Sequence, residues 1–125
     1  MINKLLLIFT IYLFSDLAYS QLPEKVSPEV YKVILENKDV KVYEVEFKPG
    51  QSDKMHKHKV TTFYVVEGGT FKSTAKDGTI TEREFKAGDN GHTDQGAVHQ
   101  VTNTGNTTIK ILLVEHKKLR IKKKK

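Results

Sequence analysis

The stretch "PGQSDKMHKHKVTTFYVVEGG" (Pro49–Gly69) places His56 and His58 one residue apart on a predicted β-strand. Successive side chains of a strand point to opposite faces, so these two histidines share a face. If the strand runs without a bulge, the same face also carries Val60, Thr62, Tyr64 and Val66. The two valines favour a site that faces the interior, although spacing alone also fits a pair of surface histidines.

The sequence around this stretch predicts an all-β protein. The segment "VKVYEVEFKPG" alternates cleanly and puts Tyr43, Val45 and Phe47 on one face. The segment "TFKSTAKDGTITEREF" is typical of a hairpin, in which Asp77-Gly78 predicts a type I′ turn. No window sustains a helical period over ten residues, and many short strands separated by turns indicate a sandwich or a barrel.

A second glycine-led pattern, "GDNGHTDQGAVHQVTN", lies further along the chain. Its spaced residues are Gly88, Asp94, Gly96, His99 and Asn103. In the first stretch, Gly50 and five further residues precede the pair His56 and His58, and Gly69 follows eleven residues later. Together the two patterns resemble the paired motifs of the cupin superfamily, G-x5-H-x-H-x3-4-E-x6-G and G-x5-P-x-G-x2-H-x3-N. The resemblance covers about residues 40–116.

The resemblance implies a single-domain cupin-type β-barrel, also described as a double-stranded β-helix or jelly roll, with its ligands inside. By motif position the metal ligands are His56, His58 and His99. The fourth ligand of the motif, a glutamate, falls at Thr62, and the proline of the second motif falls at Asp94. The resemblance also implies a homodimer, because small cupins commonly dimerise.

The missing glutamate changes the predicted chemistry of the site. Three neutral imidazoles leave a divalent ion its full charge of +2, which attracts anions such as carboxylates. Imidazole ligands suit iron, nickel, zinc or copper. A metal-free pocket is the alternative, because loss of a carboxylate ligand weakens metal affinity. Thr62 then serves as a hydrogen-bonding group at a vacated ligand position, and Thr62→Glu is predicted to raise the affinity for a divalent metal.

Two further side chains are candidates to line the pocket. Tyr64 shares the predicted histidine face and is either a pocket residue or part of the core. His92 lies two residues before Asp94 and is either a ligand or acid–base group, or an ordinary surface or core histidine. Thr62, Tyr64 and His92 are therefore the predicted cofactor-binding residues, and no catalytic residue is assigned.

The two ends of the chain differ from its body. Residues 1–20 predict a secretory signal peptide, with Lys4 before an apolar run and a small-x-small cleavage site at its end. An uncleaved anchor is the alternative to this cleaved signal. A signal peptide predicts a periplasmic or secreted protein. The rest divides into an N-terminal segment with the first strand, the barrel, and a basic, disordered tail: 21–39, 40–116 and 117–125.

Composition and charge narrow the classes of function. The chain has no cysteine, which excludes disulfides, thiolate zinc sites and a cysteine nucleophile. The net charge is +6, but the lysines and arginine of residues 117–125 carry all of it, so the body is near neutral. This tail predicts at most a weak, salt-sensitive contact with an anionic surface. No nucleic-acid partner is predicted, because a recognised binding motif is absent.

The predicted function is that of an exported cupin barrel that binds a divalent metal and a small polar or anionic molecule. The alternative is a metal-dependent enzyme of dioxygenase or isomerase type that acts on a small carboxylate or a sugar-like substrate. Catalysis stays open, because the evident bases are limited to His92, Asp94 and a metal-bound hydroxide.

Overall fold

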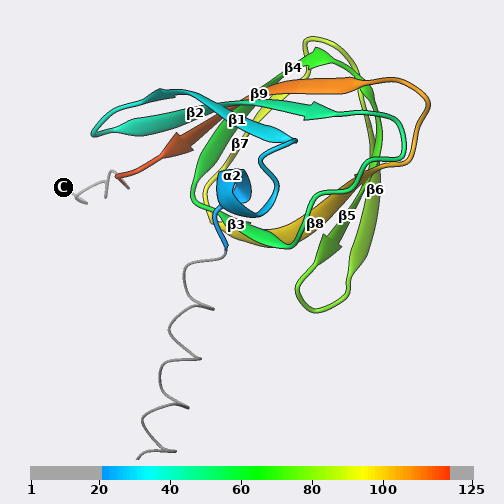
Figure 1. Cartoon of the computed structure of the whole chain (residues 1–125), viewed down its shortest axis with the longest axis horizontal. Coiled ribbons are helices and arrows are strands. Elements are labelled where there is room, and N and C mark those ends of the chain that lie inside the picture. The colour runs from blue at the N-terminus through cyan, green and yellow to red at the C-terminus, as the bar shows by residue number, and fades with distance from the viewer. Residues whose placement is uncertain (1–20, 119–125) are drawn as a thin grey trace, which may run out of the picture.

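The computed structural model describes residues 21–118, which form two antiparallel β-sheets facing each other (Figure 1). One sheet has the strand order β1-β2-β9-β4-β7. Its strands are β1 Tyr31–Glu36, β2 Val40–Phe47, β4 Thr61–Glu67, β7 Asn90–Thr93 and β9 Ile109–His116. The other sheet has the order β3-β8-β5-β6. Its strands are β3 His56–His58, β5 Gly69–Ala75, β6 Ile80–Phe85 and β8 Ala97–Asn103. The predicted all-β barrel is confirmed.

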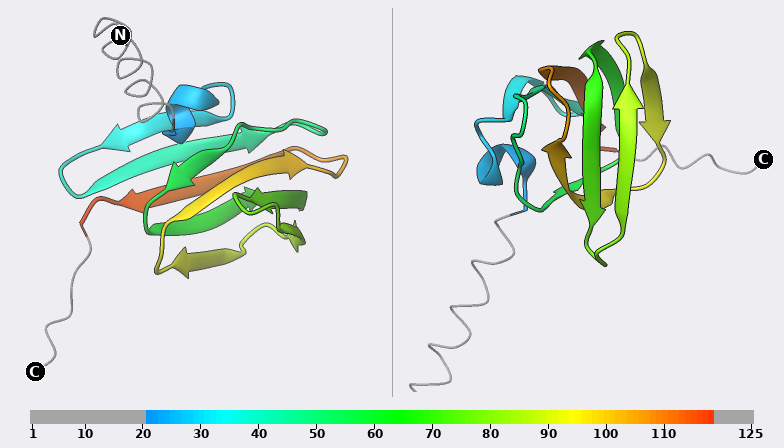
Figure 2. Two further views of the ribbon diagram at one scale, coloured as in Figure 1. Left: turned by 90° about the horizontal axis from the view of Figure 1, so that it is seen from below. Right: turned by 90° about the vertical axis from the view of Figure 1, so that its right-hand side faces the viewer.

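The N-terminal segment adds a short helix to the barrel. Helix α2 (Pro23–Val26) lies beside β1 and β3 (Figures 1 and 2). Proline suits this first turn, where its missing N–H would have no helical partner. Among residues 21–118, no helix has the length and apolarity needed to cross a membrane. The predicted signal peptide, residues 1–20, lies outside the described residues.

The core fills the space between the two sheets. Tyr43, Val45 and Phe47 are buried while Glu44 is exposed, which confirms the faces predicted for this strand. They pack with buried side chains from three other segments: Val30, Tyr31, Val101 and Ile109. The Tyr31 ring meets Tyr43 and Phe47 edge-on, with ring centroids 6.0 and 6.3 Å apart, a favoured aromatic geometry. This aromatic group forms one wall of the interior.

The predicted single strand that starts at His56 is two strands in different sheets. β3 pairs with β8, whereas β4 pairs with β7 and β9. The chain passes from one sheet to the other after His58, so the alternation of faces does not continue across the link. Both histidines are buried as predicted. Within β4, however, the inward residues are Thr61, Phe63 and Val65. The predicted inward face of Thr62, Tyr64 and Val66 is wrong.

The β5–β6 turn also differs from the predicted type I′. Gly78 has a φ of 89°, but no non-glycine residue among those described has a positive φ, so Asp77 does not. The Gly78 N–H donates to the Ala75 carbonyl at 2.9 Å, and Asp77 Oδ1 accepts from the Thr79 N–H at 2.9 Å. One left-handed glycine after the turn, instead of two left-handed residues within it, closes the hairpin.

The basic tail begins in an ordered contact with the β1–β2 turn. Lys117 Nζ donates to Glu36 Oε1 at 2.8 Å, and the Lys117 N–H donates to the Asp39 carbonyl at 2.9 Å. Lys118 Nζ lies 3.5 Å from the Asp39 carboxylate. The predicted disorder therefore does not apply to these two lysines, and residues 119–125 lie outside the described residues.

Candidate metal centre and its cavity

Three histidines from two neighbouring strands meet inside the barrel. His56 and His58 project from β3, and His99 projects from β8, directly opposite His56 in the strand pairing. One ring nitrogen of each histidine lies within 4.8 Å of the others. His56 and His58 are buried and His99 is half-buried. The structure therefore brings the three predicted metal ligands together, at separations that one ion bridges after small side-chain shifts.

The second nitrogen of each β3 histidine contacts an acceptor, which fixes the position of its proton. His56 Nδ1 lies 2.8 Å from the Lys54 carbonyl oxygen, and a carbonyl can only accept. His58 Nδ1 lies 2.8 Å from Oε1 of the buried Glu115, and a carboxylate also accepts. Both rings therefore carry hydrogen on Nδ1, and in the neutral form both keep a lone pair on Nε2.

These lone pairs converge without a donor between them. The Nε2 atoms of His56 and His58 are 2.8 Å apart. The Tyr31 hydroxyl is 3.2 Å from His56 Nε2 but gives its only proton to Asp53 Oδ2, 2.8 Å away. Within the described residues, His99 Nε2 is buried and has no hydrogen-bond partner. Such an arrangement needs a cation or a shared proton at its centre, and three imidazole nitrogens are a donor set that fits a divalent transition metal.

Burial keeps two of the ligands in the neutral form that binds metal. Burial, with a smaller contribution from the nearby His58, lowers the pKa of His56 to about 3 and the pKa of His99 to about 4. Metal binding at pH 7 therefore needs no proton release from either ring. Burial instead raises the pKa of Asp53 to about 6, against hydrogen bonds from Val101 N–H and the Tyr31 hydroxyl, which lower it.

Glu115 is a site residue that the sequence reasoning missed. It is buried in β9, and its carboxylate accepts the hydrogen bond from His58 Nδ1. A carboxylate behind a ligating histidine fixes the ring orientation and raises its basicity. The sequence did contain a signal, because Glu115 continues the inward face of Ile109, Ile111 and Leu113 in "IKILLVEH". An acidic residue on such an apolar face needs a buried partner.

The predicted cofactor-binding residues Thr62, Tyr64 and His92 do not join this triad. Thr62 Oγ1 lies 2.9 Å from both His92 Nδ1 and His116 Nε2, and His92 Nε2 lies 3.2 Å from Asp94 Oδ1. Tyr64 is 50% exposed. These residues gather on the outer face of the five-stranded sheet, because β4 turns its other side to the interior. Their predicted position inside the pocket is wrong, and for His92 the alternative of a surface histidine holds. The half-buried His116 joins this outer group.

Thr61 occupies the position predicted for Thr62. It is buried and lines the same cavity as His58. Its Oγ1 lies 2.9 Å from Thr93 Oγ1, across the β4–β7 pair. β4 therefore offers a hydroxyl to the cavity, but from Thr61 and not from the predicted Thr62.

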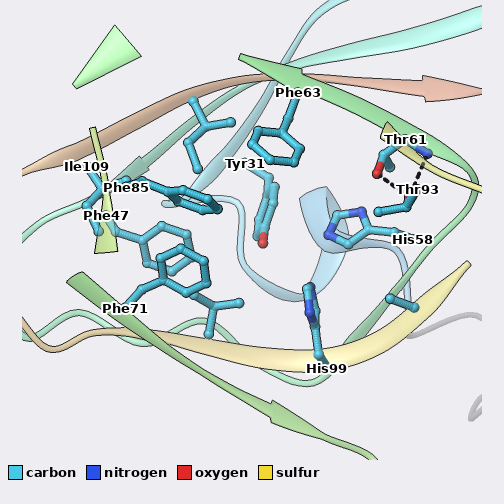
Figure 3. A pocket seen from close by; sticks show the side chains of 13 residues that line it. Tyr31, Phe47, His58, Thr61, Phe63, Phe71, Phe85, Thr93, His99 and Ile109 are labelled. Atoms are coloured by element: carbon cyan, nitrogen blue, oxygen red, sulfur yellow. Dashed lines mark hydrogen bonds between the residues drawn. The ribbon is translucent and has the colours of Figure 1, made fainter. Parts of the chain in front are cut away.

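A cavity of about 180 Å³ adjoins the histidines (Figure 3). His58, His99, Thr61 and Thr93 lie at one end, and Tyr31 lies near the middle. The other end is formed by Phe47, Phe63, Phe71 and Phe85. Among the described residues, the cavity lining contains no Asp, Glu, Lys or Arg. The positive partner of an anion in this cavity would therefore have to lie at the histidine end.

The fold and the site define a double-stranded β-helix with an interior cluster of three histidines. Residues 43–115 match the family described as the Cupin domain, which is more than half of the chain. The chain therefore belongs to the cupin family.

Known relatives agree with this assignment. The chain is 36% identical over 86 residues to the oxalate-binding protein of Thermotoga maritima, covering 66% of this chain and 67% of that protein. A cupin domain from Bordetella pertussis superposes with a TM-score of 0.65 at 23% identity, covering 71% of this chain and 93% of that chain. An RmlC-like cupin family protein from Methanocaldococcus jannaschii gives 0.57 at 12% identity, covering 70% and 78%. These structures support the fold alone.

Proposed function

We propose that this cupin barrel binds a divalent transition metal through His56, His58 and His99, and a small polar or anionic molecule in the adjoining cavity. One observation carries the proposal. The Nε2 atoms of His56 and His58 lie 2.8 Å apart while Nδ1 of each ring contacts an acceptor, and the buried Nε2 of His99 has no partner among the described residues. A bound metal would supply iron, nickel, zinc or copper chemistry and a positive charge at this point.

A carboxylate is the favoured anion. The cavity lining has no Lys or Arg among the described residues, so an unpaired buried anion there would be strongly disfavoured. A metal held by three neutral imidazoles keeps its charge and supplies the missing partner. The likeness to an oxalate-binding protein supports a small carboxylate as the bound molecule.

Binding is favoured over turnover. No carboxylate lines the cavity among the described residues, which leaves only histidine and hydroxyl groups for general acid–base chemistry. An enzyme of dioxygenase or isomerase type would have to work with these groups and the metal alone.

Elemental analysis of the full chain, purified without an affinity tag, tests the proposal. We expect about one equivalent of iron, nickel, copper or zinc per chain. Calorimetric titration should then show oxalate binding to the metal-loaded protein and none to the metal-free protein. A chain that takes up no divalent metal, even after incubation with excess ion, would contradict the metal site. Equal oxalate binding with and without metal would contradict the role of the metal in anion binding.

We also propose that the protein is exported to the periplasm or the medium, acts as a homodimer, and makes a weak contact with anionic surfaces through its basic tail. The charged start, apolar run and cleavage-site pattern of residues 1–20 support export. Intact-mass measurement of the natural protein should give a chain that begins near Gln21. A mass that retains residues 1–20 would contradict a cleaved signal.

A further inference from the structure

The cavity beside the triad has two chemically different ends. Figure 3 shows His58, His99, Thr61 and Thr93 on one side and phenylalanine rings on the other. The rings pack into one group, with centroids 5.4 Å apart for Phe63 and Phe85 and 4.8 Å apart for Phe71 and Phe85. Ile109 and Ile111 complete this end. A ligand that fills the cavity must therefore match a polar end and an apolar end.

The cavity is larger than a small dicarboxylate such as oxalate would fill. A dry cavity of about 150 Å³ lined by Leu, Ile and Phe is known to accept benzene. The volume here is about 180 Å³, which accommodates a six-membered ring and part of a small polar group. Oxalate would occupy the histidine end and leave the phenylalanine end without a partner. An apolar body would fill that end and remove its surface from water.

The charge distribution selects a monocarboxylate. The polar end offers the predicted metal position and the hydroxyls of Thr61 and Thr93, while the apolar end offers no polar side chain. A second carboxylate placed at the phenylalanine end would be buried without a partner, which is strongly unfavourable. One carboxylate at the metal and an uncharged body elsewhere satisfies both ends.

We infer that the preferred ligand is a monocarboxylate with a single ring-sized apolar body, bound with its carboxylate at the histidine triad and its ring among Phe63, Phe71 and Phe85. This inference rests on the proposed metal-dependent binding of a small anion and specifies the class of that anion. The aromatic side chains offer faces and edges suited to offset or edge-to-face packing with a ring.

Calorimetric titration of the zinc-loaded full chain with benzoate and with acetate tests the inference. The two probes carry similar carboxylates, so the difference between their affinities reports the ring and not the metal contact. We expect benzoate to bind about tenfold or more tightly than acetate, because only its ring becomes buried in the cavity. Oxalate, measured in parallel, reports anion binding at the metal without an apolar body.

Two variants of neighbouring residues locate the ring. Ile111→Phe should fill the apolar end and reduce the benzoate preference to that of acetate, with metal content unchanged. Leu112→Phe is the matched control, because Leu112 lies on the outer face of the same strand and is 39% exposed. It should keep the full preference. If Ile111→Phe does not fold, Phe71→Ala serves instead and should weaken benzoate binding while acetate binding stays unchanged.

The outcomes separate the inference from the function on which it rests. Metal-dependent binding of oxalate and acetate with no preference for benzoate would overturn the inference and leave the proposed function standing. A benzoate preference that survives in Ile111→Phe, or benzoate binding that needs no metal, would overturn the assigned pose. A chain that binds neither zinc nor any of the three anions would overturn both.

Discussion

The barrel carries one histidine cluster in its interior, on β3 and β8, and another on the outer face of the five-stranded sheet, and the two differ in burial and in hydrogen bonding. In the inner cluster, His56 and His58 are buried and His99 is half-buried, and acceptors at Nδ1 fix the two rings of β3. The outer cluster joins His92 and His116 through the Thr62 hydroxyl and extends to Asp94, whose side chain is 93% exposed.

The comparison shows what turns neighbouring histidines into a ligand set. In the outer cluster, the ring nitrogens near Thr62 and Asp94 already have polar partners. In the inner cluster, the Nε2 atoms converge with no donor, because Nδ1 carries the proton in both β3 rings. Burial and fixed tautomers therefore distinguish the candidate metal centre from the polar surface group.

The largest expected contrast is in metal content. His58→Ala should reduce bound metal from about one equivalent to near zero, because a two-histidine site binds far more weakly. His92→Ala is the matched control from the outer cluster and should leave the metal content unchanged. Elemental analysis of both variants after identical purification gives the comparison. If the two variants contain the same amount of metal, the assignment of the metal to the inner cluster is wrong.

A second contrast is in the pH dependence of stability of the metal-free protein. The pKa values of His56 and His99 are about 3 and about 4 when folded, below the usual value of 6.5. The unfolded chain therefore binds more protons between about pH 6.5 and 4, and stability falls as the pH falls through this window. Asp53, with its pKa raised to about 6, opposes this loss, because the folded state takes up its proton first.

Two histidines outweigh one aspartate, so we expect a net loss on the order of 2 to 4 kcal/mol between pH 7 and 4.5. Urea unfolding at several pH values measures it. His56→Gln should flatten the curve, because it removes one of the two buried rings whose pKa is lowered. Stability that stays constant or rises on acidification would show that the inner rings are not held neutral.

A smaller effect concerns the carboxylate behind His58. Glu115→Gln keeps the shape of the side chain but removes its charge, and should weaken metal binding by about tenfold. Glu44→Gln changes the same residue type at an exposed position of β2 and should have no effect. Competition with a metal-sensitive dye measures both affinities. Identical affinities for the two variants would limit Glu115 to a structural role.

The smallest expected effect is on metal affinity, and it tests which residues of β4 face the interior. Thr61→Glu adds a carboxylate beside the inner cluster and should raise metal affinity several-fold, with the cavity providing room for the longer side chain. Thr62→Glu adds the same group one residue later, on the outer face, and should leave the affinity of the inner site unchanged. If Thr62→Glu raised the affinity and Thr61→Glu did not, the uninterrupted strand predicted from the sequence would be correct.

Local patterns predicted the strands and the shared face of His56 and His58, whereas the cupin barrel and the role of His99 were implied by the resemblance to the two cupin motifs. Alternation in "VKVYEVEF" defines which side of β2 is buried, and the His-x-His spacing puts two rings on one face. Thr62 and Tyr64 were misplaced because the chain changes sheets at the two residues after His58, and no alternation rule extends across such a link. Tyr31 and Glu115 come from segments distant in the sequence, so their contacts with the triad depend on tertiary packing.

Two of the three candidate ligands lie on β3, a three-residue strand at the edge of its sheet, whose strand partner in the described part of the chain is β8. A metal shared by His56 and His99 would therefore connect these two strands through side chains as well as backbone. Its binding energy would oppose local opening of β3. Amide hydrogen exchange in β3 would then slow on metal loading, while exchange in β2 and β9 would change little. Stripping the metal would release this edge of the barrel before the remainder of the fold.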